Sequence, residues 1–442
     1  MFGQFLVDGH ASGAADAIVE PEREVTWAEL EECSRAIRHA YGHAIAGRRI
    51  GLSFLPVAAS YATLAAMDAL AGDAFLLDST LSLEASLALA ERLRLCALLV
   101  PTTSLCEPFL EVHSLHHEEK GTGNSTVTIL TSGSTGEPKA VRHSWKSLSR
   151  PIRTRSMEVT PKWLLAYRPH LYAGLQVALQ CFADNGTLVI PSAQMSPGAI
   201  ANFMAATGVQ YASATPSYWR RLILFADKET LTSVPLVQVT LGGEVVDQPM
   251  LDSLKSLFPK ARIVHIYATT EFGRCFSVHD GLAGFPASYL NCLLPDGVEL
   301  TVSGNELLVR SGNSSASNLS HDFAATGDLV EVREQRVCFV GRTSEIINVA
   351  GSKVHPAEVE RIIRTVDGVS NVRVFGKVSS IAGELVACEI VPAYSQDREA
   401  LRQAVAAACQ SGLAGYQRPR SITFVDDINL SSAGKTVRRK VS

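Results

Sequence analysis

Hydrophobic and polar positions alternate along the first 130 residues in segments that predict strands and helices in turn. Short apolar runs predict β-strands at residues 49–55, 74–78, 96–100 and 126–130. Between them, apolar residues at helical spacing predict helices at about residues 26–41, 58–70 and 83–93. Strands that alternate with helices are typical of an open, largely parallel α/β sheet, which binds ligands at the carboxyl ends of its strands.

The same alternation continues to about residue 266 and then changes. Further strands are expected at residues 186–190, 209–213, 236–240 and 262–266. From Gly297 to Val340 the strands become short and are separated by Gly, Asn and Ser turns, which predicts a small β-rich subdomain. A compact α+β pattern follows, with helices at about 356–365 and 397–409 and strands near 372–375 and 385–391.

Composition narrows the class of protein. A chain of 442 residues with 46% hydrophobic and 19% charged residues is expected to fold as two or three soluble domains. A net charge of −4 gives no electrostatic reason to expect nucleic acid or an anionic membrane as partner. The nine cysteines form no C-x-x-C pair, and the most apolar region, residues 50–78, is interrupted by Pro56 and Asp68. We therefore expect a cytoplasmic protein without a membrane span.

One polar stretch directly follows the predicted strand 126–130. Residues 131–139 have the sequence TSGSTGEPK. Glycines let backbone N–H groups turn towards an anion, hydroxyl groups add donors, and lysine adds a positive charge. The stretch lacks the G-x-x-x-x-G-K-[ST] spacing of a Walker A loop. It predicts a polyphosphate-binding loop, and a solvated Ser/Gly turn is the alternative.

Three further groups of residues lie downstream. The first is YATTEFG at residues 267–273, directly after a predicted strand, where a tyrosine ring could stack on a base and Thr270 and Glu271 could hold a cation. The second is LGGE at 241–244, and the third is TGD at 326–328, followed by Arg342. The alternatives are a strand-to-helix connection, a common Gly-Gly turn and an Asp-stabilised turn.

These motifs, in their order along the chain, resemble those of the adenylate-forming superfamily, which includes acyl-CoA synthetases, peptide-synthetase adenylation domains and luciferases. The resemblance runs from about Val25 to Lys440, with Ala268 in place of a usual glycine. It implies ATP and Mg²⁺ as cofactors. It assigns phosphate binding to Thr131, Ser132, Gly133, Ser134, Thr135, Gly136 and Lys139. It assigns the adenine and ribose to Gly243, Glu244, Tyr267, Asp328 and Arg342, and the metal to Glu271 beside Thr270.

The resemblance also implies a domain organisation. Residues 1–343 would form an N-terminal AMP-binding domain with stacked, largely parallel sheets and a β-rich subdomain at about 285–343. Residues 344–442 would form a small mobile α+β domain. Ser344 takes the hinge position, where the family usually has Asp or Lys, and Gly351 would line a pantetheine channel. Lys435, within AGKTVRR, takes the place of the catalytic lysine; a solvated lysine in a frayed tail is the alternative.

The acyl pocket is the part that aligns least closely. His170 and Gly174 lie where the family has an aromatic-His motif, with a spacing that differs by one residue, and Ala212 is expected near the same pocket. The chain is short for the superfamily, so loops that shape this pocket are expected to be trimmed.

The resemblance implies an ATP-dependent acid ligase. A carboxylic acid, aryl or fatty, would become an acyl-adenylate with release of pyrophosphate, and the acyl group would pass to a phosphopantetheine thiol. Lys435 and Mg²⁺ would offset the repulsion between carboxylate and phosphate. A separate acyl or peptidyl carrier protein is the favoured acceptor, because a trimmed enzyme suits a biosynthetic pathway. Free CoA, another adenylate-using enzyme, and a nucleotide-binding regulatory module without turnover are the alternatives.

Overall fold

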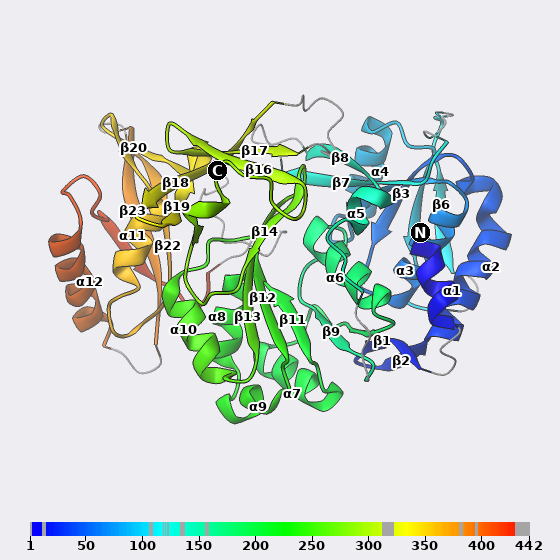
Figure 1. Cartoon of the computed structure of the whole chain (residues 1–442), viewed down its shortest axis with the longest axis horizontal. Coiled ribbons are helices and arrows are strands. Elements are labelled where there is room, and N and C mark those ends of the chain that lie inside the picture. The colour runs from blue at the N-terminus through cyan, green and yellow to red at the C-terminus, as the bar shows by residue number, and fades with distance from the viewer. Residues whose placement is uncertain are drawn as a thin grey trace.

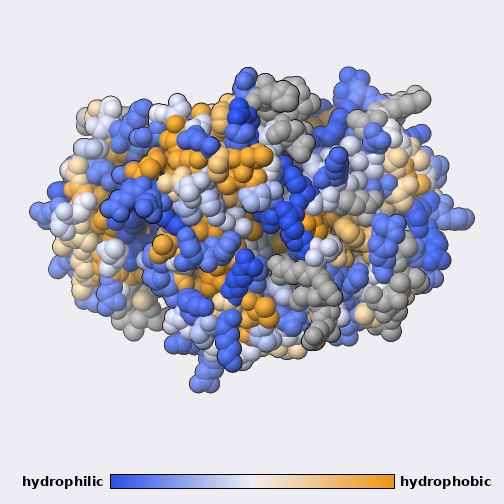
Figure 2. Space-filling view, in the orientation of Figure 1, coloured by the Kyte–Doolittle hydropathy of each residue, from blue (hydrophilic) through white to orange (hydrophobic). Residues whose placement is uncertain are grey.

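A computed structural model describes most of the chain. The described residues are 2–10, 15–105, 109–117, 119, 121, 123–132, 138–154, 159–311, 322–379, 383–393 and 397–428. Figure 1 shows two sheets with their helices, a smaller sheet next to β14 (Gly273–Val278), and an α+β domain at one end. On the same face, hydrophobic residues gather near the centre of a mostly hydrophilic surface (Figure 2).

The first sheet delivers the chain to the predicted phosphate loop. Its order is β6-β5-β3-β4-β7-β8. The strands are β3 (Arg49–Phe54), β4 (Asp73–Asp78), β5 (Ala97–Pro101), β6 (Leu110–Ser114), β7 (Thr126–Ser132) and β8 (Pro138–Ser144). The pairs of β3 with β4 and β5 and of β4 with β7 are parallel, as predicted, whereas β6 and β8 run antiparallel at the two edges.

Helices follow these strands where the hydrophobic pattern expects them. They are α2 (Trp27–Ile45), α3 (Ala58–Ala69) and α4 (Leu83–Arg92). Thr26 caps α2 through a capping box, in which its Oγ1 accepts a hydrogen bond from Glu29 N–H at 3.2 Å and Glu29 Oε2 accepts one from Thr26 N–H at 2.8 Å. A short helix, α1 (Phe2–His10), packs Phe2 into the same core.

The second sheet has the order β14-β13-β12-β11-β9-β10-β1-β2. Its strands are β1 (Asp16–Glu20), β2 (Arg23–Thr26), β9 (Lys162–Leu165), β10 (Thr187–Val189), β11 (Tyr211–Ala214), β12 (Gln238–Gly242), β13 (Arg262–Thr269) and β14 (Gly273–Val278). The central strands are parallel, and β2 and β14 close the edges antiparallel. Its helices are α6 (Tyr172–Ala183), α7 (Pro197–Thr207), α8 (Pro216–Phe225), α9 (Lys228–Ser233) and α10 (Gln248–Leu257).

Alternate side chains of the second sheet enter different cores. On β11, Tyr211 stacks on Trp163 of β9, with ring centroids 4.6 Å apart, in the core shared with the first sheet. Ala212, the next residue, packs in the other core, with Leu164 and Trp219. This is the period of two that a strand imposes on its side chains.

The predicted β-rich region forms a five-stranded antiparallel sheet of order β15-β19-β18-β17-β16. Its strands are β15 (Phe285–Pro286), β16 (Val298–Ser303), β17 (Glu306–Ser311), β18 (Ala324–Arg333) and β19 (Arg336–Arg342), with a 3₁₀ turn η1 (Ala287–Tyr289). Phe272 and Phe276 from the β14 region share a core with this sheet. The subdomain is thereby joined to the second sheet.

The C-terminal part has its own core. It comprises η2 (Thr343–Glu345), β20 (Ile347–Val349), β21 (Ser352–Val354), α11 (Pro356–Ile363), β22 (Val369–Ser379), β23 (Gly383–Pro392), α12 (Arg398–Gly412) and β24 (Ser421–Phe424). The sheet order is β21-β20-β23-β22, and β24 pairs with β23. The predicted α/β protein with a small α+β domain is therefore confirmed.

Ion pairs connect this domain to the large one. Asp247 Oδ1 caps α10 by accepting a hydrogen bond from Met250 N–H at 3.1 Å, while its Oδ2 lies 2.6 Å from Arg220 Nη2 and 3.6 Å from Arg364 Nη1 of the C-terminal domain. Arg364 Nη2 also pairs with Glu360 Oε2 at 3.0 Å, within its own domain. The part of the chain that the structure describes contains no helix able to cross a membrane.

Candidate functional site

The predicted phosphate loop joins two antiparallel strands. Thr131 on β7 lies opposite Lys139 on β8, and Ser132 lies opposite Pro138. The Thr131 Oγ1 atom is 3.5 Å from the Lys139 carbonyl oxygen, and the Lys139 side chain is exposed to solvent. Gly133, Ser134, Thr135 and Gly136 lie outside the described residues. The hairpin places Thr131 and Lys139 side by side at the base of the loop.

The YATTEFG motif forms the turn of a hairpin. Strand β14 returns antiparallel to β13, with Thr269 opposite Gly273. Thr270 and Glu271 are half-buried at the tip, where Thr269 Oγ1 accepts a hydrogen bond from Phe272 N–H at 3.1 Å. The alternative of a strand-to-helix connection is wrong, because no helix follows before the chain turns back.

The Tyr267 side chain joins this hairpin to the β-rich sheet. Its hydroxyl donates a hydrogen bond to Asp328 Oδ2 at 2.7 Å. Its ring stacks with Phe276 at 5.3 Å and with Phe339 at 5.2 Å between centroids. Burial raises the pKa of Tyr267 well above its usual value, and the neighbouring Asp328 carboxylate raises it further. The hydroxyl is thus a neutral donor over the whole physiological range.

Asp328 is a buried carboxylate between two donors. It lies directly opposite Arg342 on the β18–β19 hairpin, and Arg342 Nε approaches its Oδ1 to 2.6 Å. Thr326 Oγ1 accepts a hydrogen bond from the Asp328 N–H at 3.1 Å, so the threonine, and not the aspartate, supports the TGD turn. The Asp-stabilised turn is therefore not the role of this side chain. An ionised carboxylate offers about four acceptor positions, so Asp328 keeps capacity for further donors.

Gly243 and Glu244 follow β12. Gly243 has φ +83°, a left-handed conformation that favours glycine. Glu244 Oε2 accepts a hydrogen bond from Ser217 N–H at 2.9 Å, at the start of α8. A carboxylate at a helix N-terminus stabilises that terminus. The contact observed for Glu244 is therefore structural, and it positions the LGGE loop beside α8.

His170 lies in a charged cluster at the carboxyl end of β4. Its Nε2 is 3.9 Å from Asp78 Oδ2, and Arg168 Nη1 is 3.2 Å from Asp78 Oδ1. Burial lowers the pKa of His170 to about 4, although Asp78 opposes the shift. The imidazole is therefore neutral at pH 7. Because β4 pairs with β7, the cluster lies next to the strand that enters the phosphate loop.

Two predicted pocket residues have other roles. Gly174 lies in the first turn of α6, and a Cβ there would be 2.2 Å from the Arg168 carbonyl oxygen. It is a close-packing glycine between helix and loop. Ala212 is buried, and its side chain packs in the core with Leu164 and Trp219. Ser213, its neighbour on β11, points to the opposite face by strand alternation.

The residues predicted in the C-terminal domain are mostly exposed. Ser344 lies exposed in η2, directly after β19. Gly351 has φ +87° in the β20–β21 turn, and a Cβ added to it would meet no heavy atom within 4 Å. It therefore borders open space, which a channel requires. Lys435 lies outside the described residues.

Sequence reasoning gave no site role to His143. This side chain is only 1% exposed and hydrogen-bonds the Thr270 backbone. Burial lowers its pKa to about 4. Its ring centroid is 5.7 Å from that of Tyr172. Its contact with Thr270, more than a hundred residues away in the sequence, carries no local sequence signal.

Glu271 is the carboxylate of this turn that could take part in holding a magnesium ion. No group of three His, Cys, Asp or Glu side chains gathers among the described residues, so a site made of protein ligands alone is not found there. Mg²⁺ is usually held by one or two carboxylates together with water and substrate phosphates. Glu271 would supply the carboxylate, opposite the phosphate-loop hairpin.

Comparison with protein families identifies both parts of the chain. Residues 112–306 match the AMP-binding enzyme family, and residues 358–435 match the AMP-binding enzyme C-terminal domain. The chain is 25% identical over 345 residues to acyl-CoA synthetase 7 of Caenorhabditis elegans, which covers 70% of this chain and 63% of that protein. It is 24% identical over 332 residues to 2-succinylbenzoate–CoA ligase of Listeria monocytogenes, which covers 71% of this chain and 68% of that protein.

Solved structures share the fold over nearly the whole chain. An anthranilate CoA ligase in complex with anthranoyl-AMP superposes with a TM-score of 0.78 at 18% identity, covering 98% of this chain and 95% of that one. The o-succinylbenzoate CoA synthetase of Bacillus subtilis in complex with OSB-AMP gives a TM-score of 0.71 at 18% identity, covering 99% and 97%. The alignment with the nematode protein, in contrast, spans less than two thirds of that protein.

The close packing at Gly174 gives a stability prediction. The substitution Gly174→Ala is expected to lower the free energy of unfolding by about 2 kcal/mol, because the new Cβ must displace backbone atoms. Gly198→Ala in α7 is the matched control, since its Cβ would lie no closer than 3.8 Å to other atoms. This variant should be unchanged or gain about 0.5 kcal/mol. Urea unfolding measures both, and equal stabilities would contradict the packing assigned to Gly174.

The buried histidines give a pH prediction. The pKa of His170 is about 4 in the folded protein, below its value of about 6.5 when unfolded. The unfolded chain therefore binds more protons between these pH values, and stability falls as the pH drops from 6.5 to 4. For one such histidine the loss approaches about 3 kcal/mol. Urea titrations at pH 7 and 4.5 should show a smaller loss for His170→Gln than for the wild type; an unchanged loss would contradict burial of a neutral ring.

Proposed function

The chain is a member of the adenylate-forming superfamily of AMP-binding enzymes, and we propose that it activates a carboxylic acid with ATP for transfer to a thiol. In the first step a carboxylate oxygen attacks the α-phosphorus, the bond to the β-phosphate breaks, and pyrophosphate leaves. In the second step a phosphopantetheine sulfur attacks the acyl carbon. The bond to AMP then breaks, and the thiol proton is released.

The observation that carries this proposal is the placement of Asp328. Its buried carboxylate is oriented by Tyr267 and Arg342, at distances of 2.7 Å and 2.6 Å. Arg342 Nη2 also lies 3.4 Å from Asp328 Oδ2, so three of about four acceptor positions are used and one is left for a ribose hydroxyl group. A carboxylate already held by charged and neutral donors loses little conformational freedom on binding, which favours affinity.

The remaining residues would act on the phosphates. Thr131 and Lys139, at the base of the 131–139 loop, would hold the β- and γ-phosphates that leave as pyrophosphate. Glu271 would ligate Mg²⁺, whose chemistry when bound is to neutralise charge on the phosphate oxygens. Lys435 would stabilise the charge that develops at the α-phosphate, a contribution of about 10²–10³ in rate for one well-placed donor.

Two acceptors remain as candidates for the second step. The relatives are named as CoA ligases, which supports free CoA. Gly351 lies in the exposed β20–β21 turn and borders open space. It would admit a phosphopantetheine arm from either CoA or a carrier protein. The acid is proposed to be aromatic, because relatives and neighbours are named for anthranilate, 4-chlorobenzoate and 2-succinylbenzoate.

ATP–pyrophosphate exchange tests the first step. Exchange is expected with at least one acid from a panel of aryl, dicarboxylic and fatty acids, because only adenylate formation is reversible in this way. Thioester formation with CoA and with a phosphopantetheinylated carrier protein then identifies the acceptor. Absence of exchange with every acid, despite measurable ATP binding, would favour a regulatory module. Exchange without thioester formation to either acceptor would contradict the ligase.

Lys435→Ala tests the catalytic lysine. We expect exchange to fall by at least about 10² while the unfolding midpoint stays unchanged. Lys377→Ala is the control, because Lys377 is an exposed lysine on β22 of the same domain. It should retain wild-type exchange. Wild-type exchange in Lys435→Ala would remove this residue from the mechanism.

A further inference from the structure

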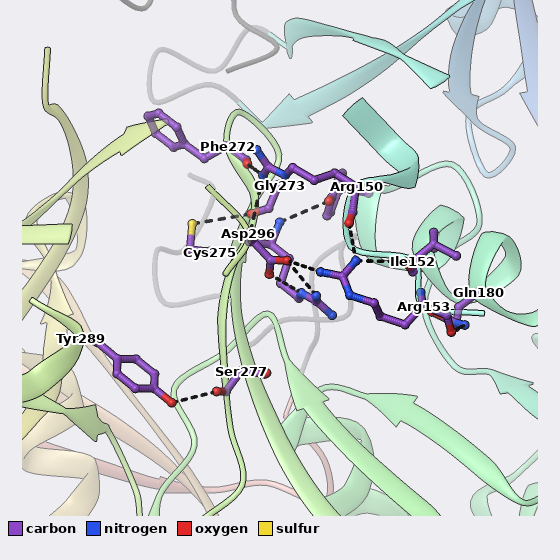
Figure 3. A network of polar contacts seen from close by, with 12 residues as sticks. Arg150, Ile152, Arg153, Gln180, Phe272, Gly273, Cys275, Ser277, Tyr289 and Asp296 are labelled. Carbon is purple, nitrogen blue, oxygen red and sulfur yellow. Dashed lines mark hydrogen bonds and ion pairs between the residues drawn. The ribbon is translucent and has the colours of Figure 1, made fainter. Parts of the chain in front are cut away.

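The turn that carries Glu271 is held from outside its own hairpin. Arg150 Nη2 donates a hydrogen bond to the Phe272 carbonyl oxygen at 2.6 Å and lies 3.5 Å from the Arg274 carbonyl oxygen (Figure 3). On the same turn, Tyr172 Oη accepts a hydrogen bond from Arg274 N–H at 3.2 Å. The backbone on the C-terminal side of Glu271 is therefore fixed by two side chains that are distant in the sequence.

Gly273 shows how closely these groups approach. Its φ is +72°, and a Cβ there would lie 2.8 Å from Tyr172 Oη and 3.3 Å from Arg150 Nη2. A side chain at this position would have to push both groups away. The contact between Arg150 and the turn therefore depends on a glycine in the left-handed conformation.

Arg150 belongs structurally to the phosphate side of the site. It is the C-terminal cap of α5 (Trp145–Ser149), which begins directly after β8, the strand that leaves the phosphate loop. Its Nη1 donates a further hydrogen bond to Ser311 Oγ of the β-rich sheet at 3.2 Å. One guanidinium thus connects the phosphate hairpin, the Glu271 turn and the β-rich sheet.

In the part of the chain that the structure describes, the contacts of Arg150 orient neighbouring groups and do not neutralise a carboxylate. Among the described residues it forms hydrogen bonds to carbonyl and hydroxyl oxygens and no ion pair. A planar guanidinium directs its donors in fixed directions, whereas an ammonium group is a single point charge. The ionic partner in this region, Asp296, pairs with Arg153 and Arg274.

We propose that Arg150 is a positioning residue that fixes the Glu271 carboxylate relative to the phosphate-loop hairpin. It acts through its hydrogen bond to the Phe272 backbone. A metal ligand must be held to within about 0.5 Å of its productive position. Loss of a group that orients a ligand typically weakens metal affinity by about 10–100-fold. This inference rests on the proposed role of Glu271 in binding Mg²⁺.

The test compares Arg150→Met and Arg150→Lys with the control Arg153→Met. Arg153 lies in the same network, where it pairs with Asp296 at 3.1 Å and donates a hydrogen bond to the Arg150 backbone carbonyl oxygen at 2.6 Å, which the Arg150 substitutions leave in place. Among the described residues its side chain makes no hydrogen bond to the turn at 269–273. For each variant, Mn²⁺ binding in the presence of ATP is titrated by electron paramagnetic resonance. The rise in unfolding temperature caused by ATP with Mg²⁺ is also measured, and exchange is recorded against Mg²⁺ concentration.

Arg150→Met is expected to weaken Mn²⁺–ATP binding by about 10–100-fold and to shift the Mg²⁺ dependence of exchange by the same factor. Arg150→Lys, which can keep one hydrogen bond, should show an intermediate shift. Arg153→Met should match the wild type in metal dependence. If Arg150→Met loses stability without ligand but keeps wild-type metal affinity, or does not fold while Arg150→Lys binds metal normally, the positioning role is overturned.

The two hypotheses can fail separately. A wild-type protein that binds Mn²⁺ and ATP but exchanges no pyrophosphate would contradict the proposed reaction, and the binding titration would still decide the role of Arg150. Wild-type exchange with identical metal dependence in all variants would contradict the role of Arg150 and leave the reaction in place.

Discussion

The buried carboxylate of Asp328 is the contact on which the junction between the second sheet and the β-rich sheet depends. It accepts hydrogen bonds from Tyr267 on the second sheet and from Arg342 on the β-rich sheet. Removal of one partner from a buried charge costs more than the bond itself contributes, because the remaining charge is left without compensation. The two sheets therefore keep one relative placement at this point, and the core around Phe276 and Phe339 packs around it.

Much of the fold was predictable because parallel strands buried on both faces are continuous apolar runs. The strands at 49–55 and 74–78 agree closely with β3 and β4. The edge hairpin β1–β2 escaped prediction, since its charged residues interrupt the apolar pattern. Strand alternation fixes which residues share a face, whereas the face on which a residue such as Ala212 lies depends on the helices that pack against the sheet.

The residues of the candidate site also differ in whether the sequence alone could predict their contacts. Asp328 and Arg342 could be paired from sequence, because they lie within one hairpin and face each other across it. The residues that hold the Glu271 turn could not be predicted. Arg150 and Tyr172 contact backbone atoms more than a hundred residues away, and any residue type supplies a backbone carbonyl. Such contacts follow from the tertiary arrangement and leave no local motif.

The ion pairs at the domain boundary have a consequence for how the two domains can separate. If the C-terminal domain moved away, Asp247 would keep Arg220 and its cap of α10, and Arg364 would keep Glu360. Arg221 and Asp427 form a second ion pair across the boundary. Because both side chains are exposed, this pair contributes little to stability. Among the described residues, Asp247 and Arg364 thus each retain a counter-ion on their own side, so reorientation leaves neither of these charges unpaired. The electrostatic barrier to rotation is correspondingly low, and it should respond only weakly to ionic strength.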